Sequence, residues 1–534
     1  MESEENSNLI LSTYIIGSGK IVVAIINLLH FLLLIRLLSI EEYALLTIGF
    51  IIPDMLSLFG ELGLDYASTH FISKMQRDQE PHKIKEVIRI NIIIKILIGF
   101  FFFLIVWLGA KFIALEIYNI NDERLITLIR FSSLEIFSRM LFNATISILL
   151  GLGKIKIIRL EIIIRMLWRT ILSISLVLYG LTLLGPMIGF FTSNIIVVLF
   201  NLFLIIKKTN KVNVKRKSIN KKLFSEMIKY GYSLLIYSFI VSIQIPIYLY
   251  ILILTSNLQN LSYFKTAVDS AKTIQILIQS ISMVLFPAFS KLDWNNEKDR
   301  KVLINNFKSS LKFSSIIILP ITCILIIFSG DIFPFLYGDD YLPASIYYSM
   351  YFMIFLFVTF GSISIPEFLK GQKQTNYVLY IETVNIVFSV VFGLIFIHFY
   401  PGIGLIFGII LGKFFSVLYS IFLIYRKYGI ILFENFKNVL FIFIIGILGA
   451  LTTFFMYNTI ISFISIQFIL IKLIFIAIFS IFYLGLFLFL IGFFSQITHK
   501  ELDFLDKTFK NIMILNKLIT YLTIIEKKLI KTRK

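Results

Sequence analysis

Residues 87–109 read VIRINIIIKILIGFFFFLIVWLG, a stretch that is long and apolar enough to cross a lipid bilayer as one helix. A basic segment, 66–90, leads into it, and the positive residues of that segment are Lys74, Arg77, Lys83, Lys85 and Arg89. The segment that follows, 109–124, is short and not strongly basic. This contrast between the two flanks predicts a membrane span with its N-terminal end in the cytoplasm.

The rest of the chain repeats the pattern. Its 534 residues are 58% hydrophobic and only 15% charged, with a mean hydropathy of +0.91, which a soluble fold of this length would not show. By length we expect about fourteen spanning helices. They fall near 12–36, 43–65, 87–109, 125–151, 159–181, 185–206, 231–255, 262–289, 313–333, 344–368, 377–399, 403–425, 438–460 and 464–494. The apolar residues do not alternate with polar ones, which favours an all-α polytopic membrane protein over a β-barrel.

Positive charge gathers in every second connection between these segments. The basic connections are 66–90, 152–159, 207–229, 290–312, 370–376, 426–437 and the tail 496–534. The pattern predicts a multi-pass protein of the cell membrane with both termini in the cytoplasm. The net charge of +19 could suggest nucleic-acid binding, but its placement beside apolar spans is explained by orientation and by anionic lipid head groups.

Two landmarks recur in the two halves of the chain. Phe71-Ile-Ser-Lys74 follows the second predicted span and Phe289-Ser-Lys291 follows the eighth, while Gly153 and Gly371 lie at nearly the same offset. An internal duplication explains this, and chance is the alternative because short polar loops use few residue types. With an even number of spans per repeat, the two halves would be parallel.

The predicted organisation has five parts. They are a six-helix lobe over 1–206, a basic cytoplasmic linker over 207–230, a second six-helix lobe over 231–425, two additional transmembrane helices over 426–494, and a basic tail over 495–534. Apolar residues at helical spacing among the lysines of the tail predict an amphipathic helix on the inner membrane surface. A partly ordered cytoplasmic tail is the alternative.

The landmarks at the helix ends carry a family resemblance. They are Arg36-Leu-Leu-Ser-Ile-Glu-Glu42-Tyr-Ala, Leu62-Gly-Leu-Asp65-Tyr-Ala-Ser68, Phe286-Pro287-Ala-Phe-Ser-Lys291 and Leu336-Tyr-Gly338-Asp-Asp-Tyr341. In this order they resemble the polysaccharide and oligosaccharide flippases of the multidrug/oligosaccharidyl-lipid/polysaccharide exporter superfamily, over roughly residues 10–430. The resemblance implies two six-helix lobes that form a V around a central cavity. It also implies export of a lipid-linked oligosaccharide by alternating access.

Charged residues inside the predicted spans are candidate functional residues, because charge in the hydrocarbon is costly. The candidates for a cationic, substrate-binding cavity are Arg139, Arg165, Arg169, Lys20 and Lys272. Surplus positive charge in such a cavity would suit an anionic substrate, since guanidinium forks match phosphate oxygens. A pyrophosphate-linked glycolipid is such a substrate.

Each candidate also has a structural interpretation. Residues four apart on a helix can neutralise each other, and the pairs at this spacing are Glu135 with Arg139, Glu161 with Arg165, and Lys265 with Asp269. Lysines near helix ends can extend to the interface, which would explain Lys95 and Lys20. Asp54 and Asp269 could couple transport to an ion by binding H⁺ or Na⁺, or could simply pair with a cationic side chain.

Four function classes compete. A flippase for a polyprenyl-(pyro)phosphate-linked oligosaccharide fits the helix number and the positive interior, whereas the resemblance implies that a cation-coupled multidrug exporter would have about twelve spans and a cavity suited to cationic drugs. A membrane glycan polymerase or glycosyltransferase would need a larger polar loop than 109–124 or 330–343, so we expect no enzyme. A non-transporting scaffold would have little use for intramembrane arginines.

The remaining expectations concern ligands and partners. The histidines are dispersed and predict no metal site. No cofactor is expected beyond a coupling ion, and the expected partners are the glycolipid, membrane lipids and other glycan-assembly proteins. A monomer would suffice.

Overall fold

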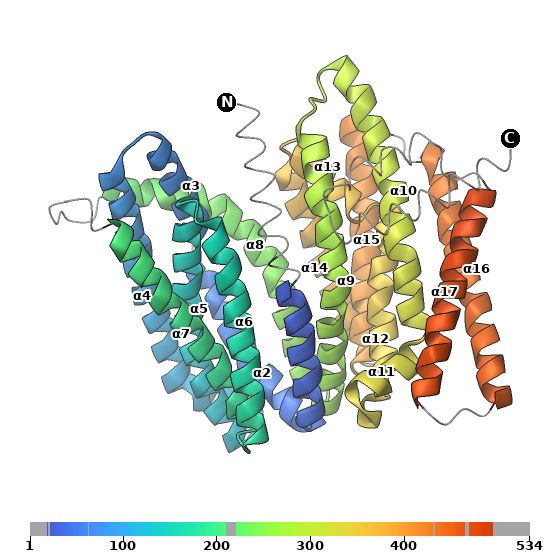
Figure 1. The fold of residues 1–534 in the computed structure, drawn as a ribbon, viewed down its shortest axis with the longest axis horizontal. Helices are drawn as coiled ribbons and strands as arrows, with labels where there is room; N and C mark the ends of the chain where they lie inside the picture. Colours follow the sequence, from blue (N-terminus) through green and yellow to red (C-terminus); the bar gives the residue numbers. More distant parts are fainter. Residues whose placement is uncertain are drawn as a thin grey trace. The chain divides into compact units, whose positions relative to one another are not determined.

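The computed structural model describes residues 19, 22–61, 63–209, 221–430, 433–464 and 469–494. In these residues the regular elements are all helices and no strand occurs (Figure 1), so the prediction of an all-α fold is confirmed. Every predicted span contains a helix. Within the described part of the chain, ten helices are long and apolar enough to cross a membrane, or eleven if the bent pair Ala344–Phe360 and Ser364–Gly371 is one span.

The chain divides into two compact units, Met1–Ser262 and Tyr263–Lys534. The first unit contains a helix over Val22–Leu37, followed by α2 (Ile40–Glu61), α3 (Leu64–Arg77), α4 (Pro81–Phe112), a π-helical turn (Ile113–Ile117), α5 (Glu123–Gly151), α6 (Ile155–Leu178), α7 (Leu184–Thr209) and α8 (Lys221–Thr255). The sequence pattern places α8 in the second lobe, whereas in the structure α8 packs against α2 and α3 of the first unit. Both ends of the predicted linker 207–230 are helical.

Helix α5 is central to the first unit because it packs against α2, α3, α4, α6 and α7 (Figure 1). Its start is well capped: the Asp122 side chain accepts a hydrogen bond from the backbone N–H of Arg124. The Arg124 guanidinium also contacts Asp122 at 2.8 Å and Glu41 of α2 at 2.7 Å. Hydrogen bonds from the Arg124 side chain lower the pKa of Asp122. The polar end of α5 is thereby tied to the start of α2.

A glycine separates α2 from α3. Gly63 has φ of +67°, a conformation that costs L-residues energy, and it lies directly against the backbone of Gly231 in α8. A Cβ on Gly63 would lie 2.6 Å from the Cα of Gly231. The two glycines allow two main chains to touch where α2, α3 and α8 meet.

A buried ion pair joins α3 to α4. Lys95 is fully buried, and its Nζ lies 2.8 Å from Oδ2 of Asp65. Ser147 of α5 donates to the other oxygen of Asp65 at 3.4 Å. The interpretation of Lys95 as a side chain that extends to the interface is therefore wrong, because its partner lies on a neighbouring helix.

The second unit begins within α9 (Leu258–Ser290). It also contains α10 (Glu297–Ile327), α11 (Ser329–Tyr337), two 3₁₀ segments (Asp339–Tyr341 and Met353–Phe360), α12 (Ala344–Phe352), α13 (Ser364–Gly371), α14 (Thr375–Phe396), α15 (Ile403–Tyr428), α16 (Phe433–Ile464) and α17 (Ile469–Phe493). The segment 290–312, which the sequence predicts as a loop, is mostly the start of α10. The tail 495–534 lies outside the described residues.

The two additional helices α16 and α17 are fastened to α11 by one carboxylate. Asp331 accepts a hydrogen bond from the Tyr457 hydroxyl at 2.8 Å and lies 3.4 Å from Nζ of Lys472. Tyr457 belongs to α16 and Lys472 to α17, so Asp331 links three helices within the second unit.

Glycines at two helix ends show matching local structure in the two units. Gly151 ends α5 and packs on Ile72 of α3, while Gly371 ends α13 and packs on Phe289 of α9. In each case a residue in the left-handed region follows two positions later, Gly153 at φ +69° and Lys373 at φ +59°. The structural counterpart of Gly371 is therefore Gly151, two residues before the Gly153 with which the sequence offset pairs it.

Candidate functional site

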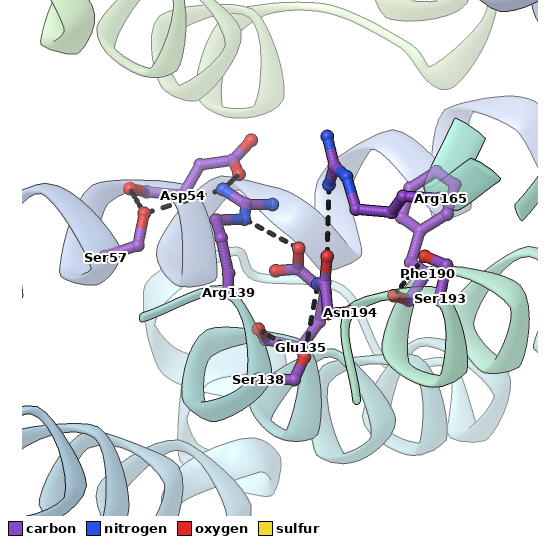
Figure 2. Close-up of polar contacts among 9 residues, drawn as sticks. All are labelled: Asp54, Ser57, Glu135, Ser138, Arg139, Arg165, Phe190, Ser193 and Asn194. Carbon is purple, nitrogen blue, oxygen red and sulfur yellow. Dashed lines mark hydrogen bonds and ion pairs between the residues drawn. The ribbon is translucent and has the colours of Figure 1, made fainter. Parts of the chain in front are cut away.

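A polar cluster lies inside the first unit, on four helices that are otherwise mainly apolar. Figure 2 shows its members from α2, α5, α6 and α7. Three of the predicted residues belong to it, Asp54, Arg139 and Arg165. Helical spacing places Glu135 and Arg139 on one face of α5, and α5 packs directly against α2 and α7.

Arg139 bridges two carboxylates. Its Nη1 lies 2.5 Å from Oδ1 of Asp54, and its Nε lies 2.6 Å from Oε1 of Glu135 (Figure 2). The Glu135 side chain is 5% exposed, whereas that of Asp54 is 44% exposed. The predicted Glu135–Arg139 pair is present. For Asp54 the sequence left two roles open, ion coupling and charge pairing, and in the structure Asp54 is paired with Arg139.

Arg165 is held by neutral groups. Its Nη1 donates to Oδ1 of Asn194 at 3.0 Å, and its guanidinium carbon lies 4.3 Å from the centre of the Phe142 ring. Asn194 in turn donates to Ser138 at 3.2 Å. Among the described residues, the buried Nε of Arg165 has no hydrogen-bond partner. The predicted pair of Glu161 with Arg165 does not form, because the guanidinium turns to α7.

Arg169 lies one turn further along α6. Its guanidinium carbon is 3.4 Å from the centre of the Phe190 ring, a cation–π contact. The His30 ring lies 5.9 Å from the same Phe190 ring and is 2% exposed. Neither ring nitrogen of His30 has a hydrogen-bond partner in the described part of the chain. Arg169, Phe190 and His30 thus extend the cluster to the helix over 22–37.

Both carboxylates of the cluster are engaged by the same arginine. Three guanidinium groups lie near two carboxylates, and both carboxylates contact Arg139. Arg165 is stabilised by an amide oxygen and an aromatic ring, which leave its charge intact. Arg165 therefore offers a positive charge beside neutral partners, and whether the cluster binds an anionic substrate stays a prediction. Such an arrangement can accept an anionic group, since arginine binds phosphate or carboxylate oxygens in a planar, two-point geometry.

The candidates in the second unit form a separate cluster on α9. Asp269 lies between two ammonium groups, 2.5 Å from Nζ of Lys265 and 2.6 Å from Nζ of Lys272. The Asp269 side chain is 8% exposed, while that of Lys272 is 52% exposed. The neighbouring Ser270 hydroxyl lies 2.7 Å from that of Tyr337. Asp269 is thus arranged as a charge partner, and whether Lys272 binds substrate stays a prediction.

Sequence reasoning missed the neutral members of the first cluster. Asn194 could have been found as an amide inside an apolar segment, whereas Phe142 and Phe190 gave no signal. Lys20 lies outside the described residues. No group of three His, Cys, Asp or Glu side chains in the described ranges could hold a metal ion.

Known proteins resemble this chain both in sequence family and in fold. A family described as polysaccharide biosynthesis protein matches residues 33–346. No curated protein matches the chain. Among solved structures, lipid II flippase MurJ in an inward closed conformation is similar with a TM-score of 0.69 at 18% identity, over 88% of this chain and 98% of that one.

Two transporters of the MOP superfamily are also similar in fold. An inward-facing multidrug resistance MATE transporter has a TM-score of 0.62 at 15% identity, over 76% of this chain and 94% of that one. A transporter from Pyrococcus furiosus has a TM-score of 0.55 at 14% identity, over 79% of this chain and 95% of that one. At these low identities the likeness shows a shared fold and nothing beyond it.

Proposed function

Because the chain belongs to the polysaccharide biosynthesis protein family, we propose that it is a flippase that carries a polyprenyl-(pyro)phosphate-linked oligosaccharide across the cell membrane. The observation that carries the proposal is the Arg165 guanidinium, which contacts an amide oxygen and an aromatic ring while both nearby carboxylates are paired with Arg139. The (pyro)phosphate is the charged part of such a glycolipid, and a guanidinium held by neutral partners is available to bind it. The protein would move this substrate without transforming it.

The orientation is part of the same proposal. Positive side chains at the ends of the spans, such as Lys83, Lys85 and Arg89 at the start of α4, would face the cytoplasm together with both termini. The two units would alternate access to the substrate from the two sides, as a monomer. The fold likeness to MurJ supports this, since that protein is a lipid II flippase.

A multidrug exporter is the second candidate, and the fold likeness to MATE transporters favours it. A cationic drug would be repelled by the Arg165 guanidinium, which is held by neutral groups, unless another part of the protein bound it. An anionic glycolipid meets no such repulsion.

A flipping assay tests the proposal. Full-length protein is reconstituted into liposomes with fluorescent polyprenyl-pyrophosphate oligosaccharide, and the rate of flipping is compared for wild type, Arg165→Gln and Arg169→Gln. We expect each substitution to lower the rate by at least about tenfold, because a charge-assisted hydrogen bond contributes roughly 1.5–3 kcal/mol. Arg130→Gln is the matched control, since Arg130 is an exposed arginine of α5 outside the cluster.

The outcomes separate the candidates. Flipping that depends on Arg165 and Arg169 but not on Arg130 supports the flippase with a phosphate site in the cluster. If wild type moves no glycolipid but exports a cationic dye against a Na⁺ or H⁺ gradient, the multidrug exporter replaces the flippase. Normal flipping by both cluster variants would show that the arginines are structural.

A further inference from the structure

Glu161, in the first two turns of α6, lies in an environment that is unusual for a carboxylate. The residue is 3% exposed. Among the described residues, neither of its carboxylate oxygens has a hydrogen-bond partner. Burying an ionised carboxylate without donors is very costly, whereas the neutral acid needs only one acceptor for its O–H. The environment of Glu161 is therefore suited to a protonated carboxyl group.

An acceptor for that proton lies beside it on α7. Asn201 is fully buried, and its α7 neighbours Val198 and Leu202 pack with Ile162, the residue that follows Glu161. Its amide nitrogen donates to the Thr145 hydroxyl of α5 at 3.2 Å, which fixes the orientation of the amide. The remaining atom, Oδ1, is buried and has no donor in the described part of the chain. Glu161 offers an acid that needs an acceptor, and Asn201 an acceptor that needs a donor.

Charged groups on the surrounding helices are engaged elsewhere. On α6 itself, Arg165 turns to Asn194, and Arg159 lies two residues from Glu161, on another side of the helix. On α5, Glu135 and Arg139 contact each other. The nearest described cation towards the end of α7 is Lys207, which is exposed. Glu161 makes no ion pair with any described residue.

We propose that Glu161 and Asn201 form a proton-binding site in which the carboxyl O–H of Glu161 donates to Oδ1 of Asn201. On loading, a hydronium ion at the membrane surface gives its proton to one carboxylate oxygen and becomes water. On unloading, the proton returns to water and the carboxylate is left buried and charged. Glu161 lies about 9 Å along α6 from its first residue, at the end flanked by Lys154 and Lys156, so exchange would be with the side these lysines face.

The site suggests how transport could be driven. The packing of α5, α6 and α7 around Glu161 accommodates the neutral acid better than the ionised carboxylate. Proton binding would therefore favour one conformation of this unit, and a proton gradient would shift the balance between conformations. This step rests on the proposed function, but proton binding itself does not. Arg165 follows Glu161 by one helical turn, which links the proton site to the proposed phosphate site.

Proton binding is tested on full-length protein in lipid nanodiscs without any transport substrate. Infrared difference spectra between about pH 6 and pH 9 are recorded for wild type, Glu161→Gln and Glu367→Gln. Glu367 is the matched control, a buried glutamate of α13 that is paired with Lys370 at 3.0 Å. We expect a protonated-carboxyl band in wild type and in Glu367→Gln, and its loss in Glu161→Gln. Identical bands in all three proteins would overturn the proposal.

Thermal unfolding provides the second readout. The folded state holds a proton that the unfolded chain releases, so wild-type stability should fall as the pH rises. We expect the unfolding midpoint of wild type to drop by about 3 °C more than that of Glu161→Gln over this pH range. If added Na⁺ at fixed pH stabilises wild type but not Glu161→Gln, the site binds the metal cation and the proton proposal fails. If the protein binds a proton at Glu161 but does not flip the glycolipid, the proton-site proposal stands and the flippase proposal fails.

Discussion

Gly63→Ala is expected to cost the protein about 2–5 kcal/mol of folding stability. Two effects add at this position. The left-handed conformation at φ +67° strains any residue with a Cβ, and that Cβ would lie 2.6 Å from the Cα of Gly231. Neither backbone can withdraw easily, since Gly231 belongs to α8 and α8 packs against both α2 and α3. Gly231→Ala should be similarly damaging without the strain, because its Cβ would lie 2.5 Å from the Gly63 carbonyl oxygen.

Two matched controls separate strain from collision. Gly153 has nearly the same conformation, φ +69°, but a Cβ at this position would meet open space, so Gly153→Ala should cost only about 1–2 kcal/mol. Gly485 is helical and also has open space, so Gly485→Ala should be close to neutral. Thermal unfolding of the four variants in detergent gives the comparison. Equal losses for Gly63→Ala and Gly153→Ala would mean that the main chains do not touch.

Much of the fold could be predicted from the sequence because the bilayer imposes simple rules. Span length and the absence of two-residue alternation were enough to predict an all-helical fold, and a helix occurs in every predicted span. The helix ends were less accurate. Segments 66–90 and 290–312 were predicted as loops, yet much of α3 and the start of α10 lie within them, because helices extend past the apolar stretch into polar sequence.

The candidate site was predictable only where its geometry is local. The Glu135–Arg139 pair follows from the four-residue spacing on one helix. The same spacing wrongly predicted that Glu161 would hold Arg165, because Asn194 on a neighbouring helix competes for the guanidinium. Likewise, nothing in the residues around Lys95 shows that Asp65 reaches it. Which helices become neighbours is a tertiary property, and it decides which charges are neutralised and which remain.

The second large effect is expected at Arg139. Arg139→Gln removes the counter-ion of two carboxylates at once, and the Glu135 side chain is only 5% exposed. Loss of one partner from a buried ion pair costs about 3–5 kcal/mol, and the low end applies here because the Asp54 side chain is 44% exposed. Arg165→Gln is the matched control, since it leaves no carboxylate behind and should be destabilised less in thermal unfolding.

A neutral triple variant then separates stability from function. Asp54→Asn, Glu135→Gln and Arg139→Gln together remove all three charges, so no buried charge is left unpaired and most of the lost stability should return. If Arg139 only neutralises its two carboxylates, the triple variant should also regain the flipping that Arg139→Gln loses. If Arg139 binds the phosphate, the triple variant should be stable and still inactive. We expect recovery of flipping, because Nε and Nη1 of the Arg139 guanidinium already donate to Glu135 and Asp54. Phosphate binding would then belong to the two α6 arginines, which rest against an amide oxygen and aromatic rings.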